Sequence, residues 1–341
     1  MRTVYGSFLF LALAACAAKA PAPSLGSVPA RMETPAVGVD GDAADDPAIY
    51  VPADPAQTRI IGTQKKGGLY VYDINGDIVQ ELLSGRPNNV DLRTDFPFSD
   101  GMGVLVVTSD RSDNAIVLWK MDPETGLIDP APKARIPSGF DEIYGICIGR
   151  VDDRMLALAT SKTGEVGVWQ IDSETDFVQR HSHDFGSIAE GCVIDDEYGH
   201  AFIAQETVGI WRMPLTPAVP EPVLIAEMTA DYLVEDIEGL AIWKGDELGG
   251  YLVASVQGAS QFAVFRRDGS RYLGSFAIDS GTGVDGVSGT DGIEISSAVV
   301  TEDFPKGLMV GQDDVNTDPA ETQNFKFVSF ADVIDAIERA D

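Results

Sequence analysis

The sequence contains few of the residues that many enzymes use as nucleophiles or to form disulfide bonds. Its 341 residues include three cysteines and three histidines. Beyond the first 16 residues only Cys147 and Cys192 remain, so disulfide bonds cannot be the main source of stability. Whether these two cysteines pair or stay as small buried residues is left open. His181, His183 and His200 lie in no recognisable histidine-nucleophile motif.

Positive charge is also scarce. The chain has 24 Lys and Arg against 54 Asp and Glu, which gives a formal net charge of -30. Nucleic acid and anionic membrane surfaces are therefore not expected as direct partners. The acidity has two interpretations, a solvated surface that prevents aggregation and a cluster of ligands for a hard cation, and both are expected to apply in part.

Long apolar runs are missing after the N-terminus, where no stretch approaches the ~20 residues of a membrane-spanning helix. The first 16 residues carry one charge, Arg2, then an apolar run over residues 8–15 and the sequence LAAC ending at Cys16. This pattern is typical of an export signal that closes on a lipobox, although an ordinary signal with a chance cysteine is the alternative. We expect an exported chain whose only membrane attachment is a lipid on Cys16.

The remainder divides into a short linker and one domain. Residues 17–37 are rich in Ala, Pro and Ser and are interpreted as a tether with a possible ring-closing strand. Residues 38–341 are about 300 residues, a size compatible with a single closed all-β domain.

Six short segments alternate apolar and other residues with period two, as half-buried strands do. They are GLYVYDING from Gly68, AIVLWKMD from Ala115, EVGVWQID from Glu165, TVGIWRM from Thr207, QFAVFRRDG from Gln261 and FKFVSF from Phe325. Each follows an apolar run and a polar hairpin, and a further strand with a polar or acidic start precedes that run. Three strands in fixed order, six times, predict a six-bladed β-propeller with four-stranded antiparallel blades.

A fourth, outer strand is expected after five of the six units, for instance IVQELLSG from Ile78. The sixth unit instead runs into DVIDAIERAD, which predicts a short C-terminal helix. We therefore expect a segment near residues 28–38 to complete the last blade and close the ring, because closure removes exposed sheet edges.

Polar residues recur at one end of every predicted blade. In an antiparallel blade, the start of the innermost strand and the hairpin between the next two strands lie at the same end. The hairpins supply Lys65, Lys66, Arg111, Lys162, Glu206, Gln257, Asp313 and Asp314, and the strand starts supply Asp46, Asp91, Tyr144, Glu190, Glu238 and Asp291. One face is thus expected to carry a basic sector from the early blades beside an acidic sector from the later ones.

Such a face suits a polyanion held by cations. Carboxylates gathered without cations repel each other, so the acidic sector predicts bound metal, and all-oxygen ligands favour Ca²⁺. Lysine, arginine and a tyrosine hydroxyl have the donor chemistry for phosphate oxygens. Neighbouring metal ions could activate a water and stabilise charge on a transferring phosphoryl group.

Eight motifs occur in order over roughly residues 38–330: GDAADDPAIY, TQKKGGLYVY, GRPNNVDLRTDFP, EIYG, AEGCVIDDEYG, DIEGL, VDGVSGTDGIE and QNFKFV. In order and spacing they resemble the motifs of the β-propeller phytases. The resemblance implies calcium-dependent hydrolysis of phytate, with calcium-phytate as the substrate, to inorganic phosphate and lower inositol phosphates. A monomer is expected.

The resemblance also implies roles for individual residues. The expected catalytic residues are Glu190, Lys65, Arg111, Lys162 and Tyr144, and the expected phosphate-binding residues are Lys65, Lys66, Arg111, Tyr144 and Lys162. The expected calcium ligands are Asp46, Glu190, Asp236, Glu238, Asp285 and Asp291. Glu206 lies in a matching loop with a less certain role. Gly289 departs from the family, which tends to carry an acid there, and this affects one peripheral calcium contact.

Two other functions fit parts of the pattern. A calcium-dependent propeller lactonase or esterase would explain the acidic sector, but it would not require Lys65, Arg111 and Lys162 together. A non-catalytic binding module of the envelope is the second, because propellers commonly serve as platforms. If the host has two membranes, the expected location is the outer membrane or the periplasm.

Overall fold

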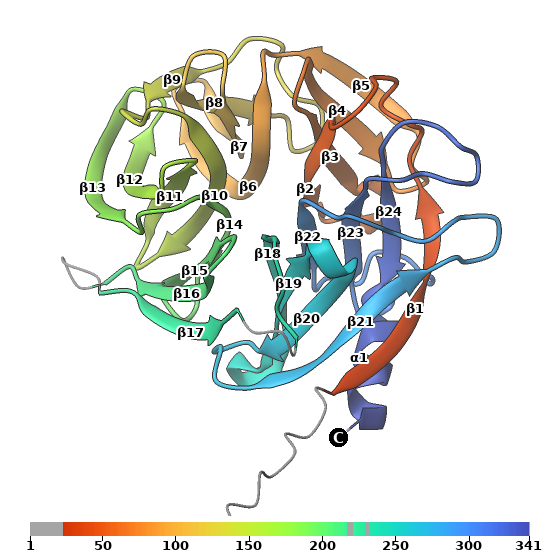
Figure 1. The fold of residues 1–341 in the computed structure, drawn as a ribbon. Coiled ribbons are helices and arrows are strands. Elements are labelled where there is room, and N and C mark those ends of the chain that lie inside the picture. The colour runs from red at the N-terminus through yellow and green to blue at the C-terminus, as the bar shows by residue number, and fades with distance from the viewer. Residues whose placement is uncertain (1–22, 217–220, 229–231, 341) are drawn as a thin grey trace, which may run out of the picture.

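The computed structural model describes residues 23–216, 221–228 and 232–340 and arranges them as a ring of six blades (Figure 1). Four blades are separate four-stranded sheets, and the other two are joined into one sheet of eight strands. This confirms the predicted six-bladed propeller with antiparallel blades. The predicted signal, Cys16 and the first part of the tether lie outside the described residues.

The first two strands of each blade are the two nearest the ring axis. The innermost strands are β2 (Ala44–Tyr50), β6 (Pro87–Phe98), β10 (Ile143–Val151), β14 (Ala189–Asp195), β18 (Ile237–Lys244) and β22 (Ile293–Ser296). The second strands are β3 (Arg59–Gln64), β7 (Gly101–Asp110), β11 (Arg154–Ser161), β15 (His200–Gln205), β19 (Gly250–Val256) and β23 (Leu308–Asp313). The second strands are almost wholly buried, because they pack on both faces against neighbouring blades.

The other two strands lie farther out. The third strands are β4 (Gly68–Asp73), β8 (Ala115–Met121), β12 (Glu165–Ser173), β16 (Gly209–Pro214), β20 (Gln261–Arg266) and β24 (Asn324–Ser329). The outer strands of the first five blades are β5 (Ile78–Leu83), β9 (Ala134–Pro137), β13 (Asp176–Asp184), β17 (Val223–Glu227) and β21 (Tyr272–Asp279). These third strands are the six repeated segments of the sequence.

The outer strand of the sixth blade comes from the N-terminal end of the domain. Strand β1 (Ser24–Glu33) pairs antiparallel with β24 through its second half and parallel with β21 through its first half. It starts four residues before the expected closing segment at 28–38 and overlaps it over residues 28–33, so the closing strand lies within the stretch 17–37. Leu25, Val28 and Ala30 are buried, so the strand packs one side into the core despite its Ala- and Pro-rich surroundings.

The hydrophobic core is divided into six clusters, each between two neighbouring blades. Between the second and third blades, for example, Phe96 and Leu118 share a cluster with Ile148 and Trp169. The cluster between the sixth and first blades contains Phe325. Within the described part of the chain, no blade is therefore left with a bare face.

The remaining elements are short. Helix α1 (Phe330–Ala340) follows β24 and packs Phe330, Val333 and Ile337 into the cluster between the fifth and sixth blades, as predicted for the C-terminus. Single 3₁₀ turns are η1 (Pro55–Gln57), η2 (Asp246–Leu248) and η3 (Gln257–Ala259). Among the described residues no helix is long and apolar enough to span a bilayer. Cys147 and Cys192 form a disulfide between β10 and β14.

Candidate active site

One hydrogen bond, repeated in all six blades, brings the hairpins to the strand starts. In the first five blades the amide of a residue in the hairpin between the second and third strands donates to the carbonyl of the residue just before the innermost strand. In the sixth blade it donates to Ser288, five residues before β22. The six pairs are Lys65 to Ala43 (2.8 Å), Arg111 to Arg86 (3.0 Å), Lys162 to Glu142 (3.2 Å), Glu206 to Ile188 (3.2 Å), Gln257 to Asp236 (2.9 Å) and Asp314 to Ser288 (3.0 Å). The predicted gathering of these two sets on one face therefore has a structural cause.

A β-bulge marks the start of the innermost strand in five blades. The register with the second strand shifts between Ala44 and Pro47, Pro87 and Val90, Ile143 and Ile146, Ala189 and Cys192, and Ile237 and Leu240. The residues inside these bulges include Asp45, Asn88, Tyr144, Glu190 and Glu238. Because a bulge re-aims side chains, it turns these groups out of the regular alternation and towards the ring axis.

Three glutamates form the centre of the acidic sector. Glu190, Glu206 and Glu238 are buried, and each offers an oxygen that lies within 4.8 Å of the other two. Burial and the charge of Glu190 raise the pKa of Glu206 to about 7, and the same two causes raise the pKa of Glu238 well above its ordinary value. Oε2 of Glu238 is buried without a hydrogen-bond partner. A divalent cation fits this group, because hard cations take carboxylate oxygens and remove the repulsion among them.

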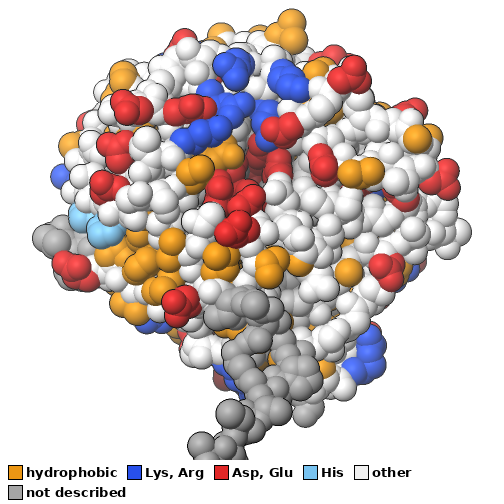
Figure 2. All heavy atoms as spheres, viewed as in Figure 1, with side chains coloured by type: hydrophobic (Ala, Val, Ile, Leu, Met, Phe, Trp, Pro, Cys, Tyr) orange, Lys and Arg blue, Asp and Glu red, His pale blue; other side chains and the backbone are white. Residues whose placement is uncertain are grey.

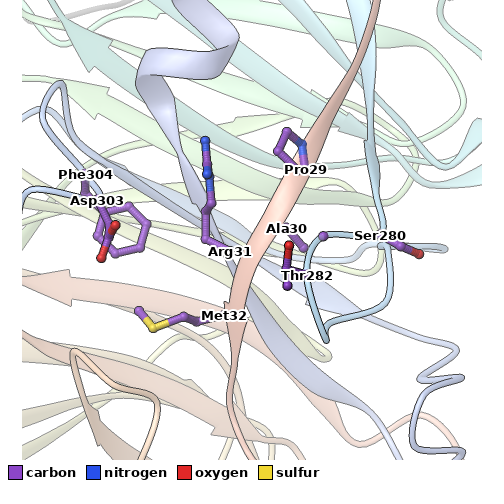
Figure 3. A pocket seen from close by; sticks show the side chains of 9 residues that line it. Pro29, Ala30, Arg31, Met32, Ser280, Thr282, Asp303 and Phe304 are labelled. Atoms are coloured by element: carbon purple, nitrogen blue, oxygen red, sulfur yellow. The ribbon is translucent and has the colours of Figure 1, made fainter.

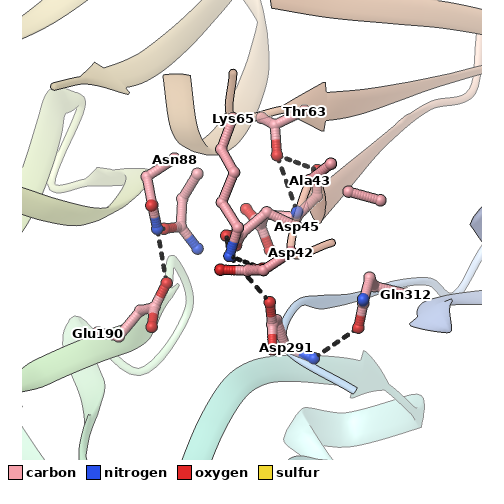
Figure 4. Close-up of polar contacts among 12 residues, drawn as sticks. Asp42, Ala43, Asp45, Thr63, Lys65, Asn88, Glu190, Asp291 and Gln312 are labelled. Carbon is pink, nitrogen blue, oxygen red and sulfur yellow. Dashed lines mark hydrogen bonds and ion pairs between the residues drawn. The ribbon is translucent and has the colours of Figure 1, made fainter. Parts of the chain in front are cut away.

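Lys65 lies among carboxylates (Figure 4). Its Nζ is 2.5 Å from Asp42 Oδ1, 2.7 Å from Asp45 Oδ2 and 3.1 Å from Asp291 Oδ2, and the residue is 5% exposed. Burial alone would lower the pKa of Lys65, but the charges of Asp45 and Asp291 outweigh it and raise this pKa. Burial raises the pKa of Asp291 to about 7. Lys65 thus joins the basic and acidic sectors.

On the face shown in Figure 2, Lys and Arg side chains gather next to Asp and Glu side chains. Lys162 Nζ lies 4.6 Å from the centre of the Tyr144 ring. Burial, together with the charges of Glu190 and Glu238, raises the pKa of Tyr144, so its hydroxyl stays protonated and can donate. Arg111 is on the hairpin of the second blade, and its Nε is buried without a hydrogen-bond partner. These groups can hold a phosphate next to the carboxylate cluster.

Two predicted site residues lie at the margin of this group. Lys66 is exposed and donates from Nζ to the backbone carbonyl of Asp40, at 2.6 Å. Asp236 is partly exposed. The pKa of Glu206 is raised mainly by burial and by the charge of Glu190, and the charge of Asp236 adds to this effect.

Asp46 is directed to a different cluster, nearer the ring axis. It lines a cavity of about 20 Å³ together with Asp91 and Glu294. Its Oδ2 accepts a hydrogen bond from the Val90 amide at 3.0 Å. Burial raises the pKa of Asp46 well above its ordinary value, and the charges of Asp45, Glu294 and Asp91 add to this effect. The cavity is large enough for about one water-sized particle.

Asp285 belongs to a third cluster, in the last blade. Its Oδ2 accepts from the amide and the hydroxyl of Thr317, at 2.6 and 2.8 Å, and its Oδ1 pairs with Lys326 Nζ. Glu33 and Asn316 also contact that ammonium group. The structure therefore does not bring Asp285 into contact with Glu190 and Glu238, although the resemblance implied all three as calcium ligands.

Sequence reasoning missed three groups that touch the site. Asn88 donates from Nδ2 to Glu190 Oε1 at 2.6 Å and is fully buried. Asp42 and Asp45 hold Lys65. All three lie within two of the motifs given above, GDAADDPAIY and GRPNNVDLRTDFP. In these motifs the pairs Asp45-Asp46 and Asn88-Asn89 were the signal that could have identified Asp45 and Asn88.

A cavity of about 590 Å³ lies elsewhere, where β1 passes the loops at Ser280–Thr282 and Asp303–Phe304 (Figure 3). Arg31 lines it and is paired with Asp332 at 2.6 Å. None of the hairpins or strand starts described above lines this cavity, so we do not include it in the site.

Comparison with known proteins bears directly on this site. The family model described as Phytase matches residues 1–341. The chain belongs to the phytase family. It is 36% identical over 321 residues to the 3-phytase of Bacillus subtilis (strain 168), covering 90% of this chain and 84% of that protein. Among solved structures, the Penicillium chrysogenum α-L-arabinanase complexed with arabinobiose shares the fold, with a TM-score of 0.59 over 89% of this chain and 98% of that one, at 9% identity.

Family membership agrees with the arrangement of charge described above. Members of the phytase family are phosphomonoesterases, and the face holds cationic donors directly beside clustered carboxylates. The resemblance seen in the sequence motifs is thereby confirmed. The arabinanase, at 9% identity, supports the fold alone.

Proposed function

We propose that the chain hydrolyses phosphate monoesters of phytate in a calcium-dependent reaction on this face of the propeller. The observation that supports this best is that two groups of side chains with opposite charge lie next to each other. The Glu190, Glu206 and Glu238 oxygens lie within 4.8 Å of one another, and Tyr144, whose pKa responds to two of those glutamates, lies beneath the Lys162 ammonium.

The basic residues bind and orient the substrate. Arg111 can take two phosphate oxygens at once through its planar guanidinium, and Lys162 supplies a point charge beside it. The Tyr144 hydroxyl is kept protonated and can donate to a third oxygen. Because Tyr144 also faces Glu190, a phosphate held by these three groups has one side turned to the carboxylates.

The carboxylates would hold calcium. Glu190, Glu206 and Glu238 are the best placed ligands, with Asp236 and Asp291 at the edge of the group, whereas Asp46 and Asp285 would serve calcium ions in separate clusters. Calcium bound there would neutralise substrate charge and lower the pKa of a coordinated water. Asn88 holds Glu190 in place through its hydrogen bond.

Calcium dependence also follows from the net charge. Phytate is a polyanion and the chain has a formal charge of -30, so their overall fields oppose encounter. Lys65 is already paired with three carboxylates, so its charge is not free to offset that of the substrate. Added cations are therefore needed to bring substrate and protein together.

The test is phosphate release from phytate by the full chain after chelation and after calcium is restored, at fixed ionic strength. We expect activity to disappear and return, and the melting temperature to fall and recover with it, because a ligand of the folded state stabilises that state by mass action. Magnesium at the same concentration is the control cation. Full activity in calcium-free protein with an unshifted melting transition would overturn the proposal.

A matched pair of variants tests the ligands. Glu190→Gln removes one charge from the cluster, and Asp152→Asn removes one from an exposed turn between β10 and β11. Only Glu190→Gln should need a higher calcium concentration for half-maximal activity, by about tenfold or more. Even mutation of residues that support metal ligands typically lowers metal affinity by that factor. Equal shifts in both variants would point to a general charge effect.

We also propose that the protein acts as a monomer outside the cytoplasm, tethered by a lipid on Cys16 in the outer membrane or periplasm. The support is the LAAC sequence after an apolar run. Labelled fatty acid should be incorporated by the wild-type chain and not by Cys16→Ser. Label in the Cys16→Ser variant, or no label in either protein, would contradict the proposed lipid anchor.

A further inference from the structure

Arg111 and Lys162 share a carboxylate that none of the assigned roles uses. Oε1 of Glu142 lies 3.9 Å from Arg111 Nη1 and 3.5 Å from Lys162 Nζ. The two cations come from hairpins of different blades, the second and the third. A single anionic oxygen between two cationic donors is also the arrangement that a bound phosphate oxygen would adopt.

Glu142 is held at this position by the backbone around it. Its carbonyl accepts the Lys162 amide at 3.2 Å, and the next amide, that of Ile143, donates to Asn114 Oδ1 at 2.7 Å. The Glu142 side chain is nevertheless 49% exposed, so it can turn away into solvent without breaking those bonds. The backbone thus keeps Glu142 beside the two cations, while its carboxylate is free to turn away from them.

Arg111 itself has unused donor capacity. Its side chain is 13% exposed, and Nε is buried without a hydrogen-bond partner. At 3.9 Å, the contact with Glu142 is an ion pair and not a hydrogen bond, since N–H···O bonds seldom exceed about 3.2 Å. A ligand that approaches more closely and offers more oxygens would satisfy Arg111 better than Glu142 does.

We propose that Glu142 is an internal competitor for substrate phosphate. Its carboxylate neutralises Arg111 and Lys162 when the site is empty, and it is displaced when a phosphate enters. Glu142 therefore weakens phosphate binding, eases the release of inorganic phosphate, and favours ligands with enough charge to displace it. This inference rests on the proposed function, because it assigns phosphate to Arg111 and Lys162.

The test compares Glu142→Gln with Asp141→Asn in the full chain with saturating calcium. Asp141 is exposed in the same loop and pairs with no cation of the described residues, so its variant controls for the loss of one negative charge near a polyanionic substrate. For Glu142→Gln, KM for phytate should fall about twofold to fivefold, the range expected when an exposed ion pair is removed. The inhibition constant of inorganic phosphate should fall by the same factor, and Asp141→Asn should change neither.

Calorimetric titration with inorganic phosphate separates this inference from the proposed function. Tighter phosphate binding by Glu142→Gln than by wild type would support the competitor role even if wild type failed to hydrolyse phytate. An unchanged or higher KM and phosphate constant in Glu142→Gln would overturn it and make Glu142 a group that positions the two cations. Equal decreases in Glu142→Gln and Asp141→Asn would also overturn it, because they would report only net charge.

Discussion

At the scale of single residues, glycine follows the site residue in four successive blades. The pairs are Tyr144-Gly145, Glu190-Gly191, Glu238-Gly239 and Asp291-Gly292. A Cβ on Gly145 would lie 1.9 Å from the carbonyl oxygen of Glu190, and a Cβ on Gly191 would lie 2.0 Å from that of Glu238. The absence of a side chain at these positions lets neighbouring inner strands approach each other closely. The carboxylates of different blades can therefore lie next to one another.

Gly191→Ala tests this close approach. The added methyl group would collide with the backbone of the next blade, so we expect a loss of stability of about 1–3 kcal/mol, as for overpacked cores, together with a higher calcium requirement. Gly311→Ala is the control, since the nearest atom to its Cβ would be 3.7 Å away. Urea unfolding and calcium titration of activity would measure both, and equal effects of the two substitutions would contradict the steric explanation.

The sequence predicted which side chains gather on this face, but it did not predict the contacts that they make. Strand alternation and hairpin position indicated that Lys65, Glu190 and Glu238 share a face. Asp45 and Asp46 are adjacent within the bulge at the start of β2 and reach different clusters, one with Lys65 and the other with Asp91. A one-residue change of register reverses which side a residue faces, and no local pattern in the sequence announces a bulge.

At the scale of secondary-structure elements, the disulfide joins the innermost strands of the blades that supply Tyr144 and Glu190. Cys147 is three residues after Tyr144 on β10, and Cys192 is two residues after Glu190 on β14. The sequence left the pairing open because it does not specify how two blades are aligned across their interface. The bond therefore fixes the phosphate-binding blade against the carboxylate blade.

Replacing both cysteines with alanine should lower stability by about 2–4 kcal/mol, because the crosslink closes a loop with a separation of 45 residues. Thermal melting with and without reductant is the measurement. Reductant should lower the melting temperature of the wild type and leave the double variant unchanged. A wild type that melts identically in both conditions, and identically to the variant, would show that the bond does not contribute.

A buried ion pair joins the end of β14 to the hairpin between β20 and β21. Arg267 donates from Nε and Nη2 to the Asp195 carboxylate, at 2.7 and 2.6 Å, and both residues are buried. Burial alone would raise the pKa of Asp195, but the hydrogen bonds from Arg267 and from the Tyr198 amide outweigh it and lower this pKa.

Asp195→Asn should cost about 1.5–3 kcal/mol at neutral pH, because it weakens charge-assisted hydrogen bonds. It leaves the buried Arg267 with Glu197, at 2.7 Å, as its remaining ion-pair partner. A carboxyl group with a lowered folded-state pKa contributes stability that is present above its unfolded value of 3.8 and lost as pH falls through the folded value. The difference between wild type and variant should therefore be constant from pH 7 to about 5 and shrink below about 4. Urea unfolding across this range, with calcium held constant, measures it, and a difference that grows on acidification would contradict the assignment.

At the scale of the whole molecule, the ring depends on a strand from one end of the domain. Strand β1 connects the fifth blade to the sixth, and its buried side chains belong to the cluster between those blades. The sequence predicted that a segment of this kind exists, because the sixth unit lacks an outer strand. The expected segment, residues 28–38, overlaps β1 over residues 28–33, and β1 starts four residues earlier, where Leu25 also packs into the core.

Val28→Asp should open or destabilise this junction. Val28 is 2% exposed, so an aspartate there buries an unpaired charge at a cost of about 3 kcal/mol or more. Ser27→Asp places the same charge on the exposed side of β1 and should have little effect. Chemical unfolding and limited proteolysis between the fifth and sixth blades would compare them, and similar stability in the two variants would argue against closure by β1.

Closure by β1 also sets the order in which the protein can be completed during synthesis. The strand leaves the ribosome before any blade exists, whereas Lys326, which contacts Glu33, is made 293 residues later. Contacts between residues so far apart in the chain slow folding. Until β21 has been made, the first strand has no partner on either edge, and until β24 follows, its second half stays unpaired and the ring cannot close.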